Sequence, residues 1–273
     1  MNVSVTATAD PSAVLDRAGA FLAGDPVRHN LMLTLLADRA RTGEPGRYWI
    51  ASTADGPVGV AFQSPLHFPI TITPMPIVAA SALAEAIAGA NGAVPGVNGE
   101  VSAAASFAGQ WTECRKAAAT PHGGQRLYEI RDVVGSTGAA GAVRPAAETD
   151  RDLLVGWLEG FHADTGERGD AAGTVEKRLP AGHFWIWDDA GASSMAALSP
   201  AVAGTVRVQA VYTPPARRCR GYAGALVAAL SETVLSRGER CVLYTDLANP
   251  TSNSVYRRIG YRAVSEILRY RFE

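Results

Sequence analysis

The segment spanning residues 211–226 carries the residue types that most directly suggest chemistry. It reads VYTPPARRCRGYAGAL, so a β-branched stretch leads through two prolines into a loop rich in arginine and glycine, and an apolar helical stretch follows. The start of a helix leaves its first backbone N–H groups unpaired and carries a partial positive charge. Small residues such as Gly221 and Gly224 let an anion approach that backbone closely. Arg218 and Arg220 add positive charge, so the segment predicts a diphosphate-binding site.

The alternative is a plain strand–loop–helix turn, in which the glycines serve backbone geometry and the arginines form a solvated surface. A second block, downstream, favours the binding site. Residues 247–261 read LANPTSNSVYRRIGY, which places two asparagines and a tyrosine on or near a short helix that stops at Gly260. The two blocks follow one another at a spacing that one site can use.

Taken together, the two blocks resemble the GCN5-related N-acetyltransferase (GNAT) superfamily. Arg218-x-x-Gly221-x-Ala223 is similar to the Arg/Gln-x-x-Gly-x-Gly/Ala signature of that family, and residues 247–261 are similar to its second block. The resemblance covers residues 142–273 in order. It implies an enzyme that uses acetyl-CoA as co-substrate, without a metal, to acetylate an amine.

The resemblance also implies how coenzyme A is bound. The family's fold separates two neighbouring parallel strands, here 209–213 and 241–245, and the pantetheine arm pairs with the first of them as a strand would. The diphosphate lies on the N–H groups of residues 219–224, and Asn249 and Asn253 contact the arm or cap the helix. The implied cofactor-binding residues are Val211, Tyr212, Thr213, Arg218, Cys219, Arg220, Gly221, Tyr222, Ala223, Gly224, Asn249, Asn253 and Tyr256.

Catalysis by direct attack needs an acid for the departing thiolate and a base for the amine, since a lysine-type amine has a pKa of about 10.4. By resemblance Tyr256 is the acid, although a tyrosine on a helix also suits a core. Some family members carry a Glu on the strand before the loop, where this chain has Gln209, which cannot take a proton. Cys219 is interpreted as a loop residue. Candidate bases, each of which also suits a solvated surface, are Glu159, His162, Asp164, Glu167 and His183.

Three functions therefore stay open. The leading one is an N-acetyltransferase that moves an acetyl group from acetyl-CoA to a primary amine of a small molecule by direct attack. The second is a protein lysine or N-terminal acetyltransferase. The third is a non-catalytic acyl-CoA-binding sensor, which the lack of an evident base keeps open.

The element order predicts how these residues are positioned. Both halves of the chain read strand, two helices, three strands, helix, strand, helix, strands, which indicates an internal duplication. The predicted class is α/β with mixed sheets: two tandem GNAT-like domains, each a mostly antiparallel sheet flanked by helices, with a splayed strand pair. Residues 98–119 are expected to hold one helix, and residues 261–272 the last two strands.

The expected domain boundaries follow from a Gly-, Ser- and Ala-rich stretch at 134–142, which is typical of a linker. Residues 1–133 then form a degenerate GNAT-like domain and residues 143–273 the catalytic domain. Where the first domain should have its diphosphate loop, residues 73–77 read TPMPI, with neither glycine nor arginine. A proline there also removes an N–H donor, so this half is expected to wall the acceptor site and not to bind the cofactor.

Bulk properties limit the other possibilities. The 273 residues suit two domains, and the net charge of −1 gives no reason to expect nucleic acid or an anionic membrane as a partner. Three scattered cysteines suggest a reducing cytoplasm, and none has the spacing of a metal site. Neither a signal peptide nor a membrane span is expected. The expected assembly is a monomer or a homodimer.

Overall fold

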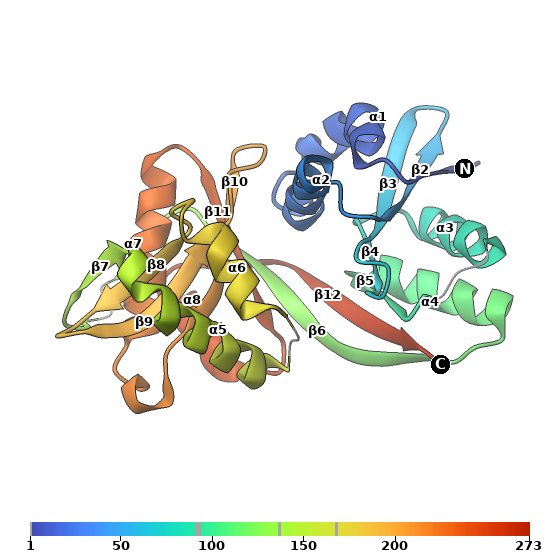
Figure 1. Cartoon of the computed structure of the whole chain (residues 1–273). Helices are drawn as coiled ribbons and strands as arrows, with labels where there is room; N and C mark the ends of the chain where they lie inside the picture. The colour runs from blue at the N-terminus through green and yellow to red at the C-terminus, as the bar shows by residue number, and fades with distance from the viewer. Residues whose placement is uncertain (1, 91–93, 136–137, 167–168) are drawn as a thin grey trace. The chain divides into compact units, whose positions relative to one another are not determined.

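The computed structural model describes residues 2–90, 94–135, 138–166 and 169–273 (Figure 1). Its contacts divide the chain into two compact units. Unit 1 comprises Met1–Leu127, Thr245–Asn249 and Ala263–Glu273, and unit 2 comprises Tyr128–Tyr244 and Pro250–Arg262. Both units are discontinuous in sequence, so the boundaries expected from the order of elements stay a prediction.

The first half of the chain folds in the order that the sequence predicts. Its elements are β1 (Ser4–Thr8), α1 (Pro11–Gly24), α2 (Asn30–Thr42), β2 (Arg47–Thr53), β3 (Gly56–Gln63), β4 (Ile70–Ile72), α3 (Ile77–Gly89), β5 (Gly96–Glu100), α4 (Val101–Arg115) and β6 (Ala119–Ile130). The start of α1 shows the local cause: the Asp10 side chain accepts a hydrogen bond from the Ser12 N–H at 2.8 Å, and Pro11 occupies the first helical turn.

The second half repeats that order. Its elements are β7 (Ala142–Pro145), the 3-10 turn η1 (Glu148–Asp150), α5 (Arg151–Thr165), α6 (Ala171–Arg178), β8 (Phe184–Asp188), β9 (Ala192–Leu198), β10 (Thr205–Tyr212), the 3-10 turn η2 (Pro215–Arg217), α7 (Tyr222–Ser236), β11 (Arg240–Asp246), α8 (Pro250–Arg258) and β12 (Arg262–Phe272). The repeated order is consistent with duplication.

One strand was not identified from the sequence, and one expectation about the elements is wrong. The helix expected within residues 98–119 is present as α4, but the strand Gly96–Glu100 precedes it. Its sequence, GVNGE, has little strand propensity, and pairing on both sides with β4 and β12 holds it extended. The two strands expected at residues 261–272 are a single strand, β12, whose sequence RAVSEILRYRF has no Gly, Pro, Asn or Asp at which to reverse.

Unit 1 contains a mixed sheet. Strands β1 to β4 pair antiparallel in sequence order, β4 pairs parallel with β5, and β5 pairs antiparallel with β12. The apolar core lies between this sheet and helices α3 and α4, and includes Leu83, Phe107 and Trp111. Phe272 of β12 stacks on Trp111 with ring centroids 4.9 Å apart. This packing explains why the C-terminal strand belongs to unit 1.

The strands of unit 2 are also mixed in direction and have a core on each face. Strands β7 to β10 pair antiparallel, and β10 pairs parallel with β11. On β9, Ala196 and Leu198 pack in the core that contains α7, whereas Met195 and Ala197 pack in the core that contains α5 and α6. Because side chains alternate along a strand, α7 covers one face and α5 with α6 the other.

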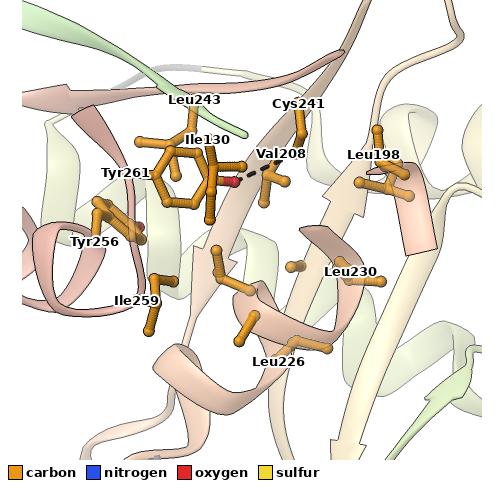
Figure 2. Packing of buried hydrophobic residues seen from close by; sticks show 14 of the residues in the cluster. Ile130, Leu198, Val208, Leu226, Leu230, Cys241, Leu243, Tyr256, Ile259 and Tyr261 are labelled. Atoms are coloured by element: carbon orange, nitrogen blue, oxygen red, sulfur yellow. Dashed lines mark hydrogen bonds between the residues drawn. The ribbon is translucent and has the colours of Figure 1, made fainter. Parts of the chain in front are cut away.

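The end of β6 also contributes to unit 2. Tyr128 and Ile130, near its end, are buried in the α7 core. Figure 2 shows Ile130 beside Leu243 and Tyr261. Each unit therefore includes a strand segment from the other half of the sequence. Within the described ranges, no helix combines the length and apolarity that a bilayer crossing requires.

Candidate functional site: a strand gap beside a helix N-terminus

The parallel strands β10 and β11 separate partway along their length. Their paired residues run from Thr205 with Arg240 to Val208 with Leu243. Both strands continue further, β10 to Tyr212 and β11 to Asp246. The separation begins where β10 is irregular: its register with β9 shifts between Gln209 and Tyr212. A β-bulge at this point bends the strand.

The side chains confirm the extra residue in β10. Val208 lies in the α7 core, and Val211 packs against the same core. In a regular strand the next residue on that face would be two positions after Val208, but Val211 is three positions after it. Ala210 and Tyr212 pack against the α5–α6 core on the opposite face. Ala210 has φ +50°, a left-handed conformation that costs an L-residue free energy. The bulge is therefore a built-in feature that opens a gap between β10 and β11.

The loop after β10 leads into an uncapped helix start. Gly221 is the N-cap of α7 at φ +82° and its cap has no side-chain hydrogen bond. The Ala225 N–H bonds the Gly221 carbonyl at 3.0 Å, so the N–H groups of Tyr222, Ala223 and Gly224 precede the first intrahelical bond. Cys219 is also left-handed, at φ +62°. Turns of this kind direct successive N–H groups into a concave anion site.

The arginines of the loop have different environments. Arg218 turns back over the end of β10: its Nε donates to the Thr213 carbonyl at 2.9 Å, and its guanidinium carbon lies 5.7 Å from the Tyr212 ring centroid. Its Nη2 forms an ion pair with Asp164 at the end of α5. The Thr213 carbonyl is thus already bonded. Arg220 is exposed and forms no ion pair within the described residues.

Tyr222 contributes its backbone N–H to the helix start while its side chain anchors the helix. The ring is 4% exposed, and the hydroxyl donates a hydrogen bond to Asp189 in the turn between β8 and β9. Another support is Ser194, whose hydroxyl bonds the Tyr212 carbonyl at 2.9 Å. These anchors were not identified from the sequence, because a single Asp or Ser in a turn carries no pattern.

Tyr256 lies on α8 within the α7 core. Figure 2 shows it beside Ile259 and Tyr261, and the Tyr256 and Tyr261 ring centroids are 6.0 Å apart. Burial raises the pKa of Tyr256 to about 12, since a phenolate is poorly solvated there. The hydroxyl therefore stays protonated at neutral pH and can donate a hydrogen bond. It can thus hydrogen-bond a developing thiolate.

The two asparagines are in different environments. Asn253 is 4% exposed and its Oδ1 accepts a hydrogen bond from the Tyr128 hydroxyl at 2.9 Å, which joins α8 to the end of β6. Asn249 is exposed and lies in the segment Thr245–Asn249 of unit 1. The structure therefore brings Val211–Gly224, Asn253 and Tyr256 together in unit 2, and does not place Asn249 relative to them.

The candidate bases differ in environment. Glu159 is exposed on α5, and Asp164 pairs with Arg218. The His162 ring lies against Gly169, where an added Cβ would be 3.0 Å from the imidazole. Burial, and then Arg178, lower the pKa of His183, so it is neutral at pH 7 and can accept a proton. Glu167 lies outside the described residues.

Coenzyme A fits this arrangement. Its diphosphate matches the uncapped N-terminus of α7, and its amide-bearing arm matches a strand edge freed by a bulge. Among the residues that the structure describes, no group of three or more His, Cys, Asp or Glu side chains could hold a metal ion.

Part of the chain matches a family model, and solved acetyltransferase structures share its fold. A family model described as FR47-like protein matches residues 193–270, from β9 into β12. An acetyltransferase of the GNAT family from Colwellia psychrerythraea is 12% identical, with a TM-score of 0.64 over 99% of this chain and 100% of that chain. A GCN5-related N-acetyltransferase from Sphaerobacter thermophilus is 14% identical, with a TM-score of 0.59 over 98% and 95%.

The tandem arrangement also has a solved counterpart. A tandem GNAT protein from the clavulanic acid biosynthesis pathway is 10% identical, with a TM-score of 0.58 over 98% of each chain. A search of the curated proteins finds no significant match. At these identities the likeness to solved structures concerns the fold. The chain has the tandem GNAT fold, as the two sequence blocks and the repeated element order predict.

Proposed function

We propose that this chain is an acetyl-CoA-dependent N-acetyltransferase that acetylates a primary amine of a small molecule by direct attack. The observation that carries the proposal is the combination of a gap beyond Val208 and Leu243 with the uncapped start of α7 at Gly221. A strand gap offers the backbone of Val211 to the pantetheine arm, and the helix start offers N–H groups to the diphosphate. Residues 193–270, which match the FR47-like model, contain both features.

The residues of the site have separate roles in the proposed reaction. A main-chain N–H near Val211 polarises the thioester carbonyl as an oxyanion donor. Tyr256 donates a hydrogen bond to the thiolate as it departs. A thiol has a pKa of about 8.5, below the value of about 12 for Tyr256, so the phenol stabilises the thiolate without giving up its proton. The amine proton leaves through water or a neutral group such as His183.

Unit 1 is proposed to lack a cofactor site of its own. The Thr73 N–H bonds the Val60 carbonyl at 2.9 Å, and the Val60 N–H bonds the Thr73 hydroxyl at 2.9 Å, so the end of β4 is tied to β3. The N-cap of α3 is Pro76, and Ile77 after it is 59% exposed. This helix start presents an apolar surface in place of the glycines of α7.

The test is calorimetry with coenzyme A, followed by thiol release from acetyl-CoA across a panel of small amines and peptides. Arg220→Gln should weaken coenzyme A binding about 2- to 5-fold at low salt, as expected for an exposed charge pair, and the difference should shrink at high salt. Arg237→Gln, exposed at the other end of α7, is the control. Binding without turnover of any amine would favour the sensor, and turnover of peptides alone a protein acetyltransferase. Absence of coenzyme A binding would disprove the proposal.

A further inference from the structure

Tyr244 is the first residue of β11 beyond its ladder with β10. Leu243 is the last paired residue and Val208 its partner, so Tyr244 is level with Gln209 at the opening of the gap. Neither the loop signature nor the second sequence block includes this tyrosine. Tyr244 still belongs to β11, which continues to Asp246, so it lies on a strand directly after a paired residue and not in a loop.

Tyr244 faces the side of the sheet that α5 and α6 cover. Cys241 and Leu243 pack in the α7 core, and side chains alternate along a strand. Val242 pairs with Arg207, so by the same alternation Arg207 and Tyr244 lie on one face, and Arg207 is near enough to lower the pKa of Tyr244. The proposed diphosphate site at the start of α7 follows the far end of β10, so Tyr244 lies at the end of the gap away from it.

The Tyr244 side chain is partly exposed to solvent. The residue is half-buried, and its hydroxyl forms no hydrogen bond with any residue that the structure describes. Burial raises the pKa of Tyr244, against a smaller opposite effect of Arg207. The hydroxyl is therefore a protonated donor at neutral pH. The neighbouring Arg207 is buried and has partners of its own, among them the Gln209 Oε1, 3.5 Å from its Nη2.

We propose that the Tyr244 hydroxyl donates a hydrogen bond to an oxygen of the amine acceptor, and so selects amines that carry a hydroxyl or carboxylate group near the nitrogen. The inference rests on the proposed function, because it assumes that the gap holds the thioester. A hydroxyl donor suits an oxygen atom and not the hydrocarbon part of a plain alkylamine. Tyr244 then orients the acceptor so that its nitrogen faces the bulge at Ala210.

The test compares matched amines: ethanolamine with ethylamine, and β-alanine with propylamine. The native protein should acetylate the oxygen-bearing member of each pair with the higher kcat/KM. Tyr244→Phe should lower kcat/KM for that member about 3- to 10-fold, the effect of one hydrogen bond. It should leave the plain amine and the KM for acetyl-CoA unchanged.

The control is Tyr261→Phe, which removes a buried hydroxyl bonded to Ser231 and Cys241. It should lower the melting temperature without changing the preference between the amines, whereas Tyr244→Phe should change the preference without lowering the melting temperature. Three results would overturn this inference without touching the proposed function. Tyr244→Phe could lower kcat/KM equally for both amines of a pair, or lower neither. The native protein could also bind coenzyme A but acetylate neither oxygen-bearing amine. If coenzyme A does not bind the native protein, the proposed function fails first.

Discussion

Single residues decide whether the site can transfer an acyl group, and the role of Tyr256 can be tested directly by substitution. Tyr256→Phe should lower kcat about 10- to 100-fold, because a hydrogen bond to a charged group contributes ~1.5–3 kcal/mol. The KM for acetyl-CoA should change little, since the hydroxyl acts on the thiolate. Steady-state kinetics measures both, and unchanged kcat would show that Tyr256 is a core residue only.

The pH dependence gives a second test of the same residue. Burial raises the pKa of Tyr256 to about 12, so its proton is retained as pH rises through the ordinary tyrosine range. Its contribution to stability is fully present below about pH 10 and is lost as pH rises toward 12. We expect kcat to show no alkaline fall assignable to Tyr256 below pH 10. An alkaline fall near pH 8–9 that disappears in Tyr256→Phe would contradict this assignment.

At the scale of the element, α7 offers an internal comparison because a glycine with positive φ lies at each end. Gly221 at its N-terminus has φ +82° and Gly238 after its C-terminus has φ +74°. Alanine at either position should lower the free energy of unfolding by about 1 kcal/mol, since L-residues pay for the left-handed region.

Only Gly221→Ala should also weaken coenzyme A binding, because its Cβ stands beside the N–H groups offered to the diphosphate. Calorimetry and thermal melting of both variants separate the two effects. Equal coenzyme A affinity in the two variants, at equal loss of stability, would show that the start of α7 does not bind the diphosphate.

The sequence predicts the elements that form the site better than the contacts that hold those elements in place. The loop around Gly221 and the helix with Tyr256 each carry a local pattern, and local patterns are readable from one sequence. The bulge at Ala210 leaves no such pattern, since it depends on how β9 and β10 pair. The contacts of Arg218 with Asp164, and of Tyr128 with Asn253, join residues 54 and 125 positions apart, which no local pattern specifies.

At the scale of the whole molecule, element order was predictable and strand partners were not. The order repeats in both halves, and the tandem GNAT fold follows from it. The partner of β5, however, is β12, from the far end of the chain. Strand pairing depends on contacts between residues far apart in the sequence, which local patterns do not specify, so the expected domain boundaries at residues 133 and 143 stay a prediction.

This sharing makes the C-terminus a structural part of unit 1. Phe272 stacks on Trp111 of α4 and packs against the same core as Phe107. Phe272→Ala should therefore lower the stability of unit 1 by about 1–3 kcal/mol, below the ~3–5 kcal/mol of a fully buried Phe, because Phe272 is only partly buried. Phe68→Ala is the matched control, since Phe68 is 45% exposed.

Hydrogen exchange measured by mass spectrometry locates the effect. Amides of α3, α4 and β5 should exchange faster in Phe272→Ala, because these elements surround the lost ring, while the α5 and α7 amides of unit 2 should keep their protection. Phe68→Ala should leave both sets unchanged. Faster exchange confined to unit 2, or none in α4, would mean that the C-terminal strand does not stabilise the first half of the chain.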